Sequence, residues 1–170
     1  MIETDRLRLR PHRVEDFNRY LPLWLTPEPA SVVPSLLLNQ EEIWARLLRW
    51  VGHWQSFGFG MFIAEDRITN EVVAEGGLAH FKRGLIEQFD NAPEAGWRVL
   101  ATRRGHGIAV EAMSAIMDWF DAREIAKRTV CLIHDGNVAS VRVATRIGFN
   151  AFGTCEFKGH SATMFERWRA

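Results

Sequence analysis

Cysteine is scarce in this chain of 170 residues. Only Cys131 and Cys155 are present, and they form no Cys-x-x-Cys pair. Such usage favours a reducing compartment in which both thiols stay reduced, and it supplies no ligand framework for a metal. The six histidines do not have the spacing of metal ligands either. We therefore expect no metal site.

An excess of charge of one sign and long hydrophobic runs are also missing. The chain holds 21 Lys and Arg against 21 Asp and Glu, so neither nucleic acid nor an anionic membrane is an expected partner. No apolar run approaches the roughly 20 residues of a membrane span, and the charged start, Met1 to Arg6, has no signal-peptide core. We expect a cytoplasmic protein with one domain, residues 1–170.

Hydrophobic periodicity predicts strands and helices that alternate in the middle of the chain, with hairpins at both ends. Asn39 followed by Glu42 is a helix-start pattern, and Gly58 ends the helix. The stretch from Pro22 to Leu38 contains further prolines and is interpreted as a loop or a broken helix. The expected strands are residues 6–10, 59–65, 71–81, 93–100, 128–133 and two around Lys158-Gly159, and the other expected helices are 14–21, 109–120 and 137–147. This order predicts a mixed α/β fold.

Two glycines lie where a strand gives way to a helix, in the segment Arg104-Gly105-His106-Gly107-Ile108-Ala109. Glycine lets backbone amides approach an anion, and the first four amides of a helix have no partner inside it. The helix dipole adds about half a positive charge there. The segment is not a dinucleotide fingerprint, because Val110 stands where the last glycine is required. Taken alone, this glycine turn, residues 104–110, is either an anion site or an ordinary tight connection.

Four separate segments resemble the GNAT acyltransferase family, in the order that the family shows. Arg104-x-x-Gly107-x-Ala109 matches its Gln/Arg-x-x-Gly-x-Gly/Ala signature. The others are the opening Glu3 to Arg10, the strand Glu94 to Val99, and Asn137 to Arg142 with Ile147-Gly148-Phe149. They look like the branch that includes ribosomal-protein N-terminal acetyltransferases. The resemblance spans nearly the whole chain and implies the GNAT fold, a mixed, mostly antiparallel, splayed sheet flanked by helices.

The resemblance also implies acetyl-CoA as co-substrate and direct transfer to an amine within a ternary complex. The cofactor pyrophosphate would bind the amides of the glycine turn: Arg104, Gly105, His106, Gly107, Ile108, Ala109 and Val110. Backbone at Val99, Leu100 and Ala101 would pair with the pantetheine arm like an added strand, and an amide near Arg98 to Leu100 would stabilise the thioester oxyanion.

Further cofactor contacts are implied on the helix that begins near Asn137. Asn137 itself is either the N-cap of this helix or a hydrogen-bond partner of pantetheine. Arg142 and Arg146 are candidates for the 3′-phosphate side of CoA, and a solvent-facing arginine is the alternative for each.

An amine acceptor must lose a proton before it attacks, because its pKa lies well above neutral pH. Glu94 is the first candidate for the base, since its strand carries the catalytic carboxylate in some branches of the family. Its distance along the strand from Leu100 favours relay through water. Glu156 is the second candidate, because the related branch places an acidic residue on that late strand. A solvated carboxylate is the alternative for each.

The CoA thiolate leaves during the reaction, and many family members protonate it with a tyrosine. This chain has Ala144 at that position, and its one tyrosine, Tyr20, lies elsewhere. The related branch suggests Ser140 as the proton donor and as a CoA contact. A helix hydroxyl bonded to the preceding turn is the alternative for Ser140.

The acceptor amine is not specified by any motif, and a protein N-terminus and a small amine both fit the resemblance. The segments expected to shape its groove, residues 22–38 and 82–92, contain Glu28, Glu87 and Asp90, which would suit a cationic amine. A catalytically silent acyl-CoA-binding module is the alternative function, because the family tyrosine is missing. A homodimer is compatible with the resemblance.

Overall fold

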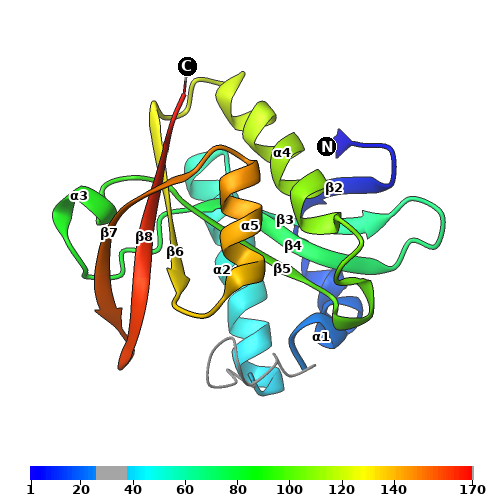
Figure 1. Cartoon of the computed structure of the whole chain (residues 1–170). Coiled ribbons are helices and arrows are strands. Elements are labelled where there is room, and N and C mark those ends of the chain that lie inside the picture. Colours follow the sequence, from blue (N-terminus) through cyan, green and yellow to red (C-terminus); the bar gives the residue numbers. More distant parts are fainter. Residues whose placement is uncertain (26–37, 170) are drawn as a thin grey trace.

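A single mixed sheet of eight strands organises the chain in the computed structural model, which describes residues 1–25 and 38–169 (Figure 1). The order across the sheet is β1-β2-β3-β4-β5-β6-β8-β7. The strands are β1 (Ile2–Glu3), β2 (Leu7–Pro11), β3 (Met61–Asp66), β4 (Val72–Ala79), β5 (Glu94–Val99), β6 (Arg128–His134), β7 (Asn150–Phe157) and β8 (His160–Trp168). Every neighbouring pair is antiparallel except β5 and β6. The predicted fold class, mostly antiparallel and flanked by helices, is confirmed.

Helices cover both faces of this sheet. They are α1 (Phe17–Leu25), α2 (Gln40–Phe57), α3 (Glu87–Asp90), α4 (Ile108–Asp121) and α5 (Val138–Arg146), with 3-10 turns η1 (Val14–Asp16) and η2 (Ala101–Arg103). In Figure 1, α4 and α5 lie in front of the sheet and α2 lies behind it. Among the described residues, no helix is long and apolar enough to cross a membrane.

The parallel strands β5 and β6 pair only at their beginnings. Glu94 is opposite Val130, and the amide of Val130 donates to the carbonyl oxygen of Pro93 over 3.0 Å. Beyond this pair the ladder stops, and the two strands diverge toward their C-terminal ends (Figure 1). The sheet is therefore open at its centre, as the predicted splayed sheet requires. We call this opening the wedge.

Successive residues of β4 face opposite sides of the sheet, as strand geometry demands. Glu75 points to α1 and α2, where its carboxylate accepts from Tyr20 and Trp24. Gly76 points to α4, where an added Cβ would lie 2.8 Å from the Met113 sulfur. The main core fills the α4 face, and a second cluster lies under α1 and α2.

Helix boundaries follow the predicted capping residues. The side chain of Asn39 accepts from the amide of Glu42, and the Glu42 carboxylate accepts from the amide of Asn39. Gly58 has the left-handed φ of 69° that a helix C-terminus favours. Gly148, with φ of 91°, follows α5 in the same way. These local predictions are confirmed because each rests on a side chain and a backbone group only a few residues apart.

One boundary prediction was wrong in part. The chain was expected to leave the helical state at Pro22, yet α1 continues through Pro22 to Leu25. Proline inside a helix costs about 3 kcal/mol. Here Leu23 and Trp24 are buried beside Ile43 and Leu47, and this burial outweighs the local preference. The rest of the predicted loop, residues 26–37, lies outside the described part of the chain.

Candidate active site

The glycine turn forms an open, positively polarised backbone segment at the start of α4. Gly105 and Gly107 have φ of 79° and 77°, a left-handed conformation that side chains disfavour. Gly105, His106 and Gly107 are exposed, and Gly107 is the N-cap of α4. The turn therefore has the backbone that an anion cradle needs.

The start of α4 differs from the starts of α2 and α5, which are capped by side chains. Asn39 caps α2 and Asn137 caps α5 with side-chain oxygens. At α4 no side chain caps the helix. The first intrahelical bond runs from the amide of Glu111 to the carbonyl oxygen of Gly107, so the amides of Ile108, Ala109 and Val110 precede it. Orphan amides at a helix N-terminus are suited to an oxyanion such as a phosphate.

An arginine from the first strand pair holds this turn from outside. Arg6 Nη1 donates to the carbonyl oxygen of His106 over 2.8 Å, and Arg6 Nε donates to Glu111 over 2.6 Å. Thr4 donates to the same carboxylate over 2.5 Å. Burial raises the pKa of Glu111, but the hydrogen bonds from Thr4 and Arg6 lower it more, and the net direction is downward. The charged pair ties the turn to the start of the chain.

Backbone direction decides which groups of β5 face the wedge. The amide of Leu100 donates to the carbonyl oxygen of Val73 in β4 over 2.8 Å. Because hydrogen-bonding direction alternates along an antiparallel strand, the amide of Arg98 also faces β4, and the amides of Trp97 and Val99 face β6. The carbonyl oxygen of Val99 accepts from Arg104 Nε over 3.2 Å.

This alternation refines the predicted pantetheine contacts. Of Val99, Leu100 and Ala101, only Val99 directs its amide into the wedge from the strand, because the Leu100 amide is used within the sheet. Ala101 lies in η2, where its carbonyl oxygen accepts from the amide of Arg104 over 3.4 Å. The amide of Trp97 was not among the predicted contacts and becomes a candidate oxyanion donor.

A small cavity of about 160 Å³ lies in the wedge. It brings together three residues predicted from the sequence, Glu94, Asn137 and Ser140. Glu94 lies on β5, and Asn137 and Ser140 lie 43 and 46 positions further along the chain, at the start of α5. The remaining lining residues are Arg83, Ala95, Gly96, Trp97, Cys131, Leu132, Ile133 and His134.

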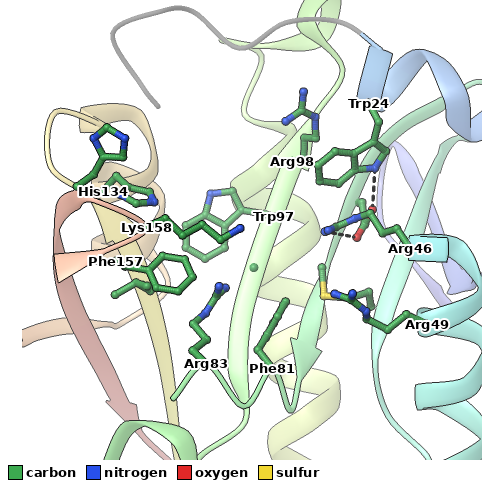
Figure 2. Close-up of a pocket in the computed structure, with 15 residues that line it drawn as sticks. Trp24, Arg46, Arg49, Phe81, Arg83, Trp97, Arg98, His134, Phe157 and Lys158 are labelled. Atoms are coloured by element: carbon green, nitrogen blue, oxygen red, sulfur yellow. Dashed lines mark hydrogen bonds and ion pairs between the residues drawn. The ribbon is translucent and has the colours of Figure 1, made fainter. Parts of the chain in front are cut away.

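A larger cavity of about 490 Å³ lies on the α1 and α2 side of the sheet (Figure 2). Its described lining consists of cationic and aromatic side chains, two histidines, three apolar or small residues and one carboxylate, Glu75. The lining residues are Trp24, Arg46, Arg49, Met61, Glu75, Phe81, Arg83, Gly96, Trp97, Arg98, Leu132, His134, Phe157, Lys158 and His160. None of the cationic residues among them was predicted as a site residue.

The two cavities meet at a shared wall. Arg83, Gly96, Trp97, Leu132 and His134 line both of them. Gly96 and Trp97 lie on β5, and Leu132 and His134 lie on β6, so the shared wall is the point where the strands have separated. The two cavities are therefore neighbours at the opening between β5 and β6.

Glu75 is the buried centre of the larger cavity's wall. Its carboxylate accepts from the Tyr20 hydroxyl, from Trp24 Nε1 over 3.1 Å and from Arg46 over 3.2 Å. Burial raises the pKa of Glu75, but Arg46, His12 and the Tyr20 hydrogen bond together lower it by more. The net pKa is below the ordinary value, and the carboxylate stays ionised. Sequence reasoning missed this residue, because its partners come from helices 29 to 55 positions away.

Glu94 is held by an arginine on both oxygens. Arg83 donates Nε and Nη2 to the two carboxylate oxygens, each over 2.6 Å. Burial raises the pKa of Glu94 above its ordinary value, although the Arg83 contacts oppose this. The Arg83 guanidinium also lies over the rings of Phe81 and Phe157, at 4.6 and 4.8 Å. Glu94 thus fixes a cation on the wall shared by the two cavities.

His134 was not singled out by sequence, yet it lies where the cavities meet. Its Nδ1 is buried and has no hydrogen-bond partner among the described residues. Burial lowers the pKa of His134, and the nearby His160 lowers it further. A lowered pKa favours the neutral imidazole at pH 7. No local sequence pattern marks His134, because its position beside both cavities results from the fold.

The other predicted residues divide into two groups. The Asn137 side chain accepts from the amide of Ser140 over 3.0 Å, so it does cap α5, and both residues line the small cavity. No hydrogen bond within the described residues joins the Ser140 hydroxyl to the preceding turn. Glu156, Arg142 and Arg146 are exposed and line neither cavity.

Glu87 and Asp90, two of the acidic residues expected around the acceptor groove, do not line the larger cavity. Asp90 accepts from the amides of Arg83 and Leu85, each over 2.9 Å, and so shapes the loop before α3. Glu87 is exposed, and Glu28 lies outside the described residues. From the segment 82–92, the larger cavity receives only Arg83. Within residues 1–25 and 38–169, no group of three or more His, Cys, Asp or Glu side chains could hold a metal ion.

Known proteins share both this sequence pattern and this fold. Residues 6–150 match the family described as acetyltransferase (GNAT) domain. The uncharacterized protein YkkB of Bacillus subtilis is 28% identical over 96% of this chain and 93% of its own length. A protein of Bordetella pertussis assigned to the GNAT acetyltransferases has a structure with a TM-score of 0.89, 31% identity and 98% coverage of both chains.

A further solved structure extends the likeness in fold to the branch suggested by the sequence. It is RimL, a ribosomal L7/L12 alpha-N-protein acetyltransferase in complex with coenzyme A, with a TM-score of 0.77 and 22% identity over 97% of this chain and 95% of RimL. The family match covers the glycine turn, the wedge and most of the lining of both cavities. The chain belongs to the GNAT acetyltransferase family.

Proposed function

We propose that the chain transfers an acetyl group from acetyl-CoA to a primary amine by direct attack in a ternary complex. The observation that carries the proposal is the shared wall: five residues line both the small cavity in the wedge and the larger cavity. Acetyl-CoA would supply the activated acyl group in the wedge. The amine would approach from the larger cavity.

The cofactor-binding groups of the proposal are backbone amides and the half-buried cap of α5, Asn137. The amides of residues 104–110 would bind the pyrophosphate, and the amides of Trp97 and Val99 would face the pantetheine arm and the thioester. An amide aimed at the developing oxyanion contributes about 3 kcal/mol in comparable acyl transfers. Asn137 would keep α5 and Ser140 against the same arm. Arg142 and Arg146 remain candidates for the 3′-phosphate.

We assign the proton-accepting role to His134. When the amine nitrogen bonds to the carbonyl carbon, its proton passes to the His134 imidazole, directly or through one water molecule. The carbon–sulfur bond then breaks and releases the CoA thiolate, to which the Ser140 hydroxyl in the small cavity would donate a hydrogen bond, and the proton taken up by His134 is released to water. Glu94 already binds Arg83 with both oxygens. Its role in this account is to position that cation.

The decisive assay measures release of the CoA thiol when the protein is mixed with acetyl-CoA and a panel of primary amines. We expect release that depends on an amine, with an equal amount of N-acetylated product by mass spectrometry. Binding of acetyl-CoA with no product from any amine would instead support the catalytically silent acyl-CoA-binding module.

Single substitutions then assign the base. His134→Gln should lower kcat by about 100-fold, the lower end of the effect of a general base. Glu156→Gln should have little effect, because Glu156 is exposed and lies outside both cavities. If His134→Gln kept full activity and either Glu94→Gln or Glu156→Gln lost it, the glutamate whose variant is inactive would be the base.

A further inference from the structure

We propose that the acceptor is a small primary amine that also carries an anionic group, a carboxylate or a phosphate. This inference rests on the proposed function and names the substrate class of the larger cavity. It replaces the expectation of a cationic amine that Glu28, Glu87 and Asp90 had suggested.

The charge of the described cavity wall is strongly one-sided. Five cationic side chains line the larger cavity, and Glu75 is the one carboxylate on the described wall. Glu75 is ion-paired with Arg46, and Glu94 behind the shared wall is ion-paired with Arg83. The two acidic groups are thus already matched by arginines.

Two further cations face each other across the cavity. Arg49 comes from α2, and Lys158 comes from the turn between β7 and β8. Both are exposed, and neither has a carboxylate partner within the described residues. Figure 2 shows their charged ends directed from opposite walls toward the space between them. A cavity with cations on both walls concentrates anions and repels cations.

Aromatic rings form much of the remaining wall, from Trp24 and Phe81 on one side to Trp97 and Phe157 on the other. Such rings favour an apolar or planar body between the charged end and the amine. A volume of about 490 Å³ is in the range of sites for small molecules. The anionic group would contact Arg49 or Lys158, and the amine would reach His134 at the shared wall.

The test compares acceptors that differ only in the anionic group. Phenylalanine is paired with phenylalaninamide, and phosphoethanolamine with ethanolamine, at saturating acetyl-CoA and one pH. Spermidine and a neutral peptide with a free N-terminus complete the panel. We expect kcat/KM for at least one anionic member to exceed that of its neutral partner by about tenfold, the effect of one charge-assisted hydrogen bond. The carboxylate and phosphate arms identify which anion is preferred.

Variants locate the preference in the cavity. Arg49→Gln and Lys158→Gln should each raise KM for the preferred anionic acceptor several-fold and leave KM for its neutral partner unchanged. Lys127→Gln is the matched control, because Lys127 is exposed and lines neither cavity. Circular dichroism of each variant checks that the fold is retained.

Two outcomes would overturn the inference while leaving the proposed function intact. One is a neutral amine, spermidine or the peptide acetylated as fast as every anionic acceptor. The other is an anionic preference that Arg49→Gln and Lys158→Gln both leave unchanged. Absence of turnover with all acceptors, in protein that still binds acetyl-CoA, would reject the proposed function and this inference with it.

Discussion

Arg6 Nη1 donates a hydrogen bond of 2.8 Å to the carbonyl oxygen of His106, in the middle of the glycine turn. The same guanidinium is ion-paired with Glu111 in the first turn of α4, at 2.5 Å. Arg6 thus connects the first strands to the proposed pyrophosphate site. Positioning of that site depends on a residue about 100 positions away in the chain.

Arg6→Gln should raise KM for acetyl-CoA by about tenfold, because a charge-assisted contact that orients the turn is lost. The kcat at saturating acetyl-CoA should change much less, since Arg6 does not line the reacting centre. Arg8→Gln is the control, because Arg8 lies two residues further along the chain, on β2, and contacts Glu3 instead of the turn. If Arg6→Gln and Arg8→Gln gave the same KM, Arg6 would have no positioning role.

Gly107→Ala should weaken acetyl-CoA binding through the backbone. Alanine at a φ of 77° costs about 1 kcal/mol, and the turn would relax away from the cradle geometry. Gly58→Ala introduces similar strain at a φ of 69°, at the end of α2 and far from the turn. Both variants should lose stability, as thermal melting would show. Calorimetric titration with acetyl-CoA should separate them, because weakened binding is expected only for Gly107→Ala.

Much of the fold, including the glycine turn at the start of α4, could be predicted because the signals are local. The Asn39 and Asn137 caps and the glycine turn each depend on residues within one helical turn of each other. The cavity walls could not be predicted in this way. The Glu75 carboxylate accepts hydrogen bonds from Tyr20, Trp24 and Arg46, which come from α1 and α2 and meet only in the folded chain.

The charge of the larger cavity was not predicted from the sequence. Asp90 is acidic in the sequence, but in the fold both of its oxygens accept backbone amides. Arg49 and Lys158 look like ordinary surface cations in the sequence, and only the fold places them on opposite sides of one cavity. The net charge of the whole chain is zero, so it gives no sign of the excess of cations on the described wall of the larger cavity.

Glu75→Gln should destabilise the protein at pH 7 by about 3 kcal/mol, because it leaves the half-buried Arg46 without its carboxylate. The pKa of Glu75 is lowered in the folded state. Its stabilising contribution is therefore complete above the ordinary value of 4.5 and is lost as the pH falls through the folded-state pKa. Urea unfolding at several pH values should show the variant and the native chain converging below pH 4.5. Glu156→Gln, at an exposed position, should show no comparable difference at pH 7.

The pH dependence of turnover tests the role of His134. Because the pKa of His134 is lowered from 6.5, the neutral base is fully present at pH 7 and is lost only as the pH falls further below 6.5. The assay uses acceptors whose own amine pKa is known. In the native chain and in Glu94→Gln, kcat should fall as the pH drops below 6.5, and in His134→Gln this fall should be absent. An unchanged profile in His134→Gln would remove the histidine from the proton path.

Initial rates measured while both acetyl-CoA and the acceptor are varied test the account most directly, because its central claim is that two ligands meet across the wall shared by the cavities. Direct transfer predicts intersecting double-reciprocal lines, and it predicts that intact-protein mass spectrometry finds no acetylated protein when the acceptor is omitted. Parallel lines, with an acetyl group on the protein that disappears when the amine is added, would contradict the account.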